Sequence, residues 1–139
     1  DYTDLLFDKE HTNYLPTGTC LPFSKKMFVT VNGKILPCER IGHQFSLGNI
    51  TDSAIEINPE WIADKYNHYY AKVESLCKSC KNNKACIQCL FNMKDIEDKP
   101  VCYGHMNEKA FQNYVNNQMY FLEKHPEAYK EIMEKVFVL

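Results

Sequence analysis

The spacing of the cysteines constrains the fold of this chain more than any other feature of its sequence. The chain has 139 residues and seven cysteines, which are Cys20, Cys38, Cys77, Cys80, Cys86, Cys89 and Cys102. Four of them form a C-x2-C-x5-C-x2-C run, in which each pair directs two sulfurs toward one point. That geometry suits a shared metal and suits a disulfide poorly, and an odd number of cysteines would leave one thiol unpaired. The sequence therefore predicts a metal-binding domain.

The amino-acid composition limits the kind of protein that this chain can be and the partners that it can bind. The hydrophobic fraction of 45% and the charged fraction of 24% are ordinary for one globular domain with a modest core. A net charge of -2 gives no electrostatic reason to bind nucleic acid or an anionic membrane. No apolar run in the sequence approaches the roughly 20 residues that span a bilayer. We therefore expect neither nucleic acid nor a membrane as a partner.

The first residues bear on the origin and the location of the chain. No methionine precedes Asp1, so we expect the chain to be a fragment of a longer protein. Residues 1–11 alternate acidic and apolar side chains and lack the positive region that opens a signal peptide. A cysteine-rich chain without an export signal is typical of the reducing cytoplasm, which is the location we predict.

A β-hairpin is the first regular element that the sequence predicts. Two runs with high strand propensity, residues 27–31 and 34–36, flank Asn32 and Gly33. Asn-Gly between such runs is a strong hairpin signal, because a type I′ turn needs positive φ at both central positions. Pairing of the two strands would bring the first two cysteines to the same end of the hairpin. The stretch 41–50, which follows, is expected to be irregular.

A helix is predicted to begin at Asn58 and Pro59 and to reach Cys77. Its apolar face has helical spacing and consists of Ile62, Tyr66, Tyr69, Tyr70 and Val73. This spacing favours core packing over a peptide-binding surface for the tyrosines, and we expect the same of Trp61. After the helix, residues 77–105 contain few aliphatic side chains, so metal ligation is the natural means of ordering them.

Two further helices without cysteines are predicted at the C-terminus. Asn107 is expected to cap the first and Pro126 to begin the second. Together with the preceding elements, they predict an α+β fold: a short β-hairpin, irregular cysteine ligand loops, flanking helices and two C-terminal helices.

The cysteine count allows more than one metal. Iron–sulfur clusters take four thiolates each, so seven cysteines fit two clusters with one coordination position open. Seven also fit two zinc ions with four and three ligands, and spacing alone does not separate these readings. His105, three residues after Cys102, is more typical of a surface or capping residue than of a ligand. A disulfide-stabilised secreted protein is a third alternative, in which at most one thiol would be free.

The full pattern resembles the signature of the SPASM domain. That signature reads C-x(9–15)-G-x4-C, a gap, C-x2-C-x5-C-x3-C, a gap and a final cysteine. This chain is similar to it from Cys20 through Cys102, with Gly33 as the inner glycine. It departs from the signature at one place, since only two residues separate Cys86 from Cys89. Such domains are the C-terminal auxiliary-cluster extensions of radical S-adenosylmethionine (SAM) enzymes that mature peptides and proteins.

The resemblance implies two 4Fe-4S clusters with interleaved ligands. By position, the distal cluster would be held by Cys77, Cys80, Cys86 and Cys102. The proximal cluster, with one open position, would be held by Cys20, Cys38 and Cys89. The implied division is a linker at 1–19 from a missing radical SAM barrel, the SPASM domain at 20–105 and a helical appendage at 106–139.

The resemblance also implies a function. The C-x3-C-x2-C motif that binds the SAM-cleaving cluster is not in this sequence, so the chain should not turn over alone. We expect it to transfer electrons, and to help position substrate, for a radical SAM oxidoreductase that matures a peptide. Its expected partners are the barrel of the parent chain and a peptide or protein substrate. The alternative is a zinc-binding interaction module without redox chemistry, since zinc also occupies thiolate sites in an isolated fragment.

Overall fold

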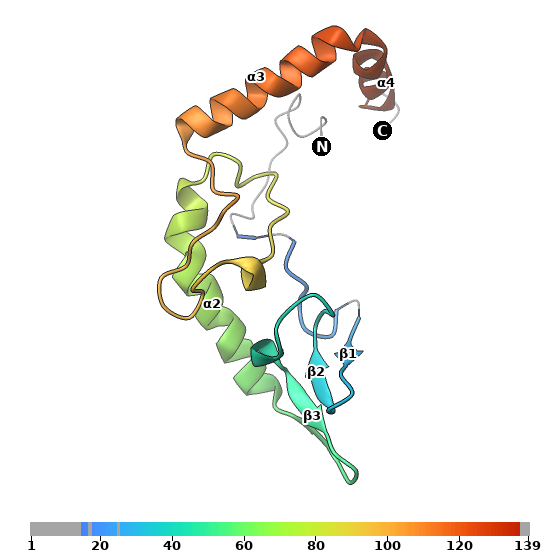
Figure 1. The fold of residues 1–139 in the computed structure, drawn as a ribbon, viewed down its shortest axis with the longest axis vertical. Helices are drawn as coiled ribbons and strands as arrows, with labels where there is room; N and C mark the ends of the chain where they lie inside the picture. Colours follow the sequence, from blue (N-terminus) through green and yellow to red (C-terminus); the bar gives the residue numbers. More distant parts are fainter. Residues whose placement is uncertain (1–14, 17, 25, 137–139) are drawn as a thin grey trace.

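A computed structural model describes residues 15–16, 18–24 and 26–136 (Figure 1). The elements follow in the order β1 Phe28–Val29, β2 Lys34–Leu36, the 3-10 helix η1 His43–Phe45, β3 Gly48–Ile50, β4 Ile55–Ile57, α2 Pro59–Ser79, the 3-10 helix η2 Leu90–Asn92, α3 Glu108–Lys124 and α4 Pro126–Val136. This architecture confirms the α+β class. Most of the linker expected at 1–19 lies outside the described residues.

The predicted hairpin is present, but its turn differs from the expected one. Strands β1 and β2 pair antiparallel, with Phe28 opposite Leu36. The loop has three residues rather than two, because Thr30 N–H donates to the carbonyl of Lys34 at 2.9 Å. Gly33 has a φ of 75°, whereas Asn32 is not among the described residues with positive φ. The type I′ turn was therefore wrong; a left-handed glycine at the end of a three-residue loop closes the hairpin instead.

The stretch expected to be irregular supplies part of a four-stranded antiparallel sheet, in the order β1-β2-β3-β4. Leu47 N–H donates to the carbonyl of Ile35 at 2.8 Å and leads the chain into β3. Gly48 lies between Ile35 of β2 and Ile57 of β4, and a Cβ atom there would lie 2.2 Å from the carbonyl oxygen of Glu56. Strands of three residues are too short for sequence periodicity to reveal, which is why this sheet was missed.

Helix α2 begins as predicted and positions the rest of the fold. The Asn58 side chain accepts a hydrogen bond from Trp61 N–H at 3.0 Å, and Pro59 is the first helical residue. In Figure 1 the sheet lies beside the N-terminal half of α2, and the yellow and orange loops lie along its C-terminal half. The expectation for Trp61 was wrong, because its side chain is 48% exposed and Lys65 Nζ lies 4.8 Å from its ring centroid.

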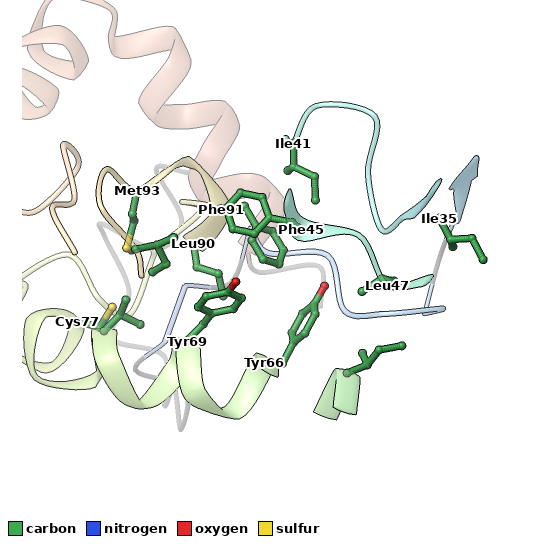
Figure 2. Close-up of a cluster of buried hydrophobic side chains, with 13 residues drawn as sticks. Ile35, Ile41, Phe45, Leu47, Tyr66, Tyr69, Cys77, Leu90, Phe91 and Met93 are labelled. Atoms are coloured by element: carbon green, nitrogen blue, oxygen red, sulfur yellow. The ribbon is translucent and has the colours of Figure 1, made fainter. Parts of the chain in front are cut away.

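The core is an aromatic cluster between α2 and the segment that follows Cys89 (Figure 2). Tyr66 and Tyr69 are buried on α2, as the spacing predicted. The Phe91 ring lies 4.6 Å from that of Phe45 and 5.5 Å from that of Tyr66, measured between centroids. Aromatic pairs at these separations contribute beyond the burial of their area. This cluster fixes the loop that carries the last cysteines against the helix that carries the first of the run.

The two predicted C-terminal helices are present, and α3 leaves the fold near the C-terminal end of α2 (Figure 1). Asn107 caps α3 by accepting a hydrogen bond from Ala110 N–H at 2.9 Å. Leu122 is the buried residue of α3, and α3 packs against α4. Within the part of the chain that the structure describes, we find no helix with the length and apolar character needed to cross a bilayer.

Candidate metal centre

All seven cysteines are free thiols, and they divide between two cavities. The four-cysteine cavity, of about 40 Å³, is lined by Cys77, Cys80, Cys86 and Cys102. The three-cysteine cavity, of about 420 Å³, is lined by Cys20, Cys38 and Cys89. The structure thus brings together the same two groups that the resemblance implied from position alone. It also separates Cys86 from Cys89, which are neighbours in the run.

The four-cysteine cavity is built at the C-terminal end of α2. Cys77 is in the last turns of the helix, and Cys80 N–H donates to its carbonyl at 3.1 Å. Met106 N–H donates to Cys80 Sγ at 3.4 Å, and Lys81 N–H donates to the Met106 carbonyl at 2.9 Å. These bonds bring the loop that contains Cys102 back against the start of the run. A continuous segment of chain therefore supplies the whole cavity.

The electrostatics of the four-cysteine cavity favour a cationic occupant. Burial is the main cause that raises the pKa of the Cys77 thiol to about 11, and the nearby sulfurs of Cys86, Cys102 and Cys80 contribute to this value. Burial also raises the pKa of Cys102, against the opposing effect of the backbone N–H of Gly104. Several thiolates this close repel one another, so they ionise together when a positive charge lies among them. A metal centre supplies that charge, and the chemistry of this donor set fits one.

The three-cysteine cavity is assembled from parts of the chain that are far apart in sequence. Cys38 follows the hairpin, Cys89 precedes η2, and the carbonyl of Cys20 accepts a hydrogen bond from the Tyr66 hydroxyl at 3.2 Å. The expectation that the hairpin gathers Cys20 and Cys38 is confirmed, since both line this cavity. Arg40 N–H donates to Cys38 Sγ at 3.4 Å, which gives this cavity its own backbone contact to sulfur.

Two residues, Ile87 and Gln88, line both cavities and form the wall between them. Gly18 N–H donates to the Gln88 carbonyl at 3.2 Å, and a Cβ atom on Gly18 would lie only 1.9 Å from the Ile87 carbonyl oxygen. The buried Thr19 Oγ1 accepts a hydrogen bond from Leu90 N–H at 2.9 Å. The segment before the first cysteine therefore holds the wall in place. Sequence reasoning missed this contact, because nothing local in Gly-Thr-Cys indicates a partner seventy positions away.

Charged side chains distinguish the two cavities. Lys26 and Arg40 line the three-cysteine cavity. Lys26 Nζ lies 2.7 Å from Glu39 Oε2, and that oxygen lies 3.8 Å from Cys38 Sγ. The hydrogen bond from Lys26 is the main cause that lowers the pKa of the Glu39 carboxyl to about 2. In the four-cysteine cavity, the titratable group besides the thiols is His105, whose Nε2 lies 3.1 Å from Ser79 Oγ.

The cysteines surround their cavities rather than meeting at one point. Across the described residues, no three His, Cys, Asp or Glu side chains are grouped closely enough to hold a single metal ion. The thiols instead line two cavities, four in one and three in the other.

Comparison with known proteins identifies one family. The family model of SPASM, an iron–sulfur cluster-binding domain, matches residues 20–90, which is about half of the chain. The match includes all of the cysteines except Cys102. No curated protein matches the chain, and no solved structure does.

Proposed function

Because this chain belongs to the SPASM family of iron–sulfur cluster-binding domains, we propose that it holds two 4Fe-4S clusters for a radical SAM enzyme. The parent enzyme would modify a peptide or protein, and this chain would serve as its auxiliary electron-transfer domain. The family match itself indicates binding of iron–sulfur clusters. We propose in addition the number of clusters, their ligands and the role in peptide modification.

The observation that carries the proposal is the division of the seven thiols into a set of four and a set of three. Four thiolates complete the ligand shell of one 4Fe-4S cluster. We assign Cys77, Cys80, Cys86 and Cys102 to that cluster, since all four line one cavity. A second cluster with three thiolates would keep one iron position open. We assign Cys20, Cys38 and Cys89 to it, because they line the other cavity.

The protein around the two sets supports different tasks. A cluster bound in such a site supplies one-electron transfer at a potential set by its surroundings. The four-cysteine cavity leaves little free space, about 40 Å³, and one of its thiols, Cys77, is buried. The three-cysteine cavity, of about 420 Å³, has the size of small-ligand sites. A cluster held there by three thiolates would keep one iron position open, and that open position supports a role of the three-cysteine side in positioning the peptide substrate.

The wall between the cavities supports electron transfer between them. Cys86 faces one cavity and Cys89 the other, and the chain from one to the other passes only through Ile87 and Gln88. The contact of Gly18 with this dipeptide fixes its position. The two ligand sets therefore share a short piece of backbone, which would keep two clusters close together.

The test is elemental analysis of the chain purified and reconstituted without oxygen. We expect about eight iron and about eight acid-labile sulfide per chain, as two 4Fe-4S clusters require. About two zinc per chain, without sulfide and without uptake of iron, would overturn the proposal and favour a structural zinc module. The same analysis on a Cys38→Ala variant should show about four iron, because only the four-cysteine set then remains complete.

A further inference from the structure

Lys26, which lines the three-cysteine cavity, forms an ion pair with Glu39. We propose that Lys26, held in place by Glu39, raises the reduction potential of the cluster in the three-cysteine cavity. This inference rests on the proposed function, since it presupposes a cluster at that site. Lys26 would act on the cluster through its charge and would not bind it as a ligand.

The geometry places both charges beside the thiols. Lys26 lines the cavity together with Cys20 and Cys38. Its ammonium is 2.7 Å from Glu39 Oε2, and the same oxygen is 3.8 Å from Cys38 Sγ. The side chains of Lys26 and Glu39 are about half exposed, at 49% and 43%, so their charges are partly screened by solvent.

The direction of the effect follows from charge. Reduction of a cluster by one electron makes its site more negative. A cation nearby stabilises the reduced form and raises the potential, while an anion lowers it. Without Lys26, the Glu39 carboxylate would face the Cys38 sulfur with the largely exposed Arg40, 3.9 Å away, as its remaining counter-charge. Lys26 therefore acts twice, because it attracts the added electron and neutralises the nearest carboxylate.

The four-cysteine cavity provides the contrast. None of its described lining residues is a lysine, arginine, aspartate or glutamate. Backbone N–H groups contact sulfur in both cavities, from Arg40 to Cys38 and from Met106 to Cys80, each at 3.4 Å. Backbone contacts of this kind raise the potential on both sides. The side-chain charges are thus the difference that should separate the potentials of the two clusters.

The experiment is a potentiometric titration of the reconstituted chain, with each cluster followed by electron paramagnetic resonance. Addition of imidazole identifies the cluster with an open iron, because only its spectrum should change. We expect Lys26→Met to shift the potential of that cluster downward and Glu39→Gln to shift it upward. The double variant should lie between the two, near the unmodified chain, and Lys26→Arg should retain the original potential because it keeps the charge.

Lys78→Met is the matched control. Lys78 also forms a 2.7 Å ion pair, with Glu74, and is adjacent to Cys77 in sequence, yet it lines neither cavity. We expect it to leave both potentials unchanged. Equal potentials in Lys26→Met, Glu39→Gln and the unmodified chain would overturn the inference, and so would equal shifts of both clusters.

Iron content separates failure of the inference from failure of the proposed function. An unmodified chain that takes up no cluster would refute the function. Two clusters with potentials that ignore these substitutions would refute only the role of Lys26. If the Lys26→Met chain fails to bind its cluster, the Glu39→Gln variant provides the test instead. A potential in Glu39→Gln that is not shifted upward would then overturn the inference.

Discussion

The two cavities differ in how the chain builds them. The four-cysteine cavity comes from one continuous segment, residues 77–105, at the end of a capped helix. The three-cysteine cavity needs the hairpin, the segment before it and the loop after the run. Closing a longer loop costs more conformational entropy, so a site assembled from distant segments depends on the rest of the fold. One set of thiols therefore lies within a single segment, whereas the other set is brought together by the fold.

The largest predicted effect tests this dependence by removing one ligand from each set. Cys80→Ala should leave the segment 77–105 without its ordering ligand, and that segment also carries Cys89. We therefore expect loss of nearly all of the roughly eight irons, compared with loss of about four in Cys38→Ala. Iron and sulfide analysis after anaerobic reconstitution gives both values. A loss of only about four irons in each variant would show that neither set depends on the other.

A smaller effect should come from the wall between the cavities. In Gly18→Ala, the new Cβ atom would lie 1.9 Å from the Ile87 carbonyl oxygen, so the wall must move. We expect a loss of about 2 kcal/mol of unfolding free energy, measured by denaturant titration, together with reduced iron at the three-cysteine site.

Gly42→Ala serves as the control for this clash. Its Cβ would approach only the far end of the flexible Gln44 side chain, at 2.1 Å from Oε1, which can turn away. A loss of stability as large in Gly42→Ala as in Gly18→Ala would contradict the importance of the wall.

The next effect in size concerns the hydrogen bond that fixes the chain after Cys89. Thr19→Val removes the acceptor of the buried Leu90 N–H. Leaving this donor without a partner should cost about 1–2 kcal/mol of unfolding free energy. Thr19→Ser keeps a hydroxyl and should restore most of the loss, and its failure to do so would assign the effect to the methyl group instead.

The smallest effect is expected outside both cavities. Asn107→Ala removes the cap of α3 and should cost about 1 kcal/mol of helix stability, visible by circular dichroism on heating. Iron and sulfide content should stay unchanged, because Asn107 lines neither cavity. A drop in iron would show that α3 supports the four-cysteine cavity through the neighbouring Met106.

Sequence patterns predicted the elements whose formation depends on residues close together in the chain. Asn58 and Asn107 were identified as caps because capping acts within one helical turn. The α2 spacing placed Tyr66 and Tyr69 in the core, whereas Trp61, which lies outside that spacing next to the buried Ile62, is 48% exposed. The strands β3 and β4 were not predicted, because a strand of three residues is too short to show the alternation of apolar and polar side chains.

The candidate site was predictable only in its thiols. The resemblance grouped the seven cysteines as the cavities do, and no local rule would have separated Cys86 from Cys89. The contact of Gly18 with Ile87 and the ion pair of Lys26 with Glu39 both arise from tertiary packing. Such contacts join residues that are distant in sequence, so they leave no recognisable pattern in a single sequence.

The central claim, a division of the thiols into four and three, is tested most directly by Mössbauer spectroscopy of the chain reconstituted with isotopically enriched iron. We predict two 4Fe-4S clusters in equal amounts, about eight irons in all, with one iron whose signal changes when imidazole is added. A single cluster, or two clusters in which no iron responds to the added ligand, would contradict that division.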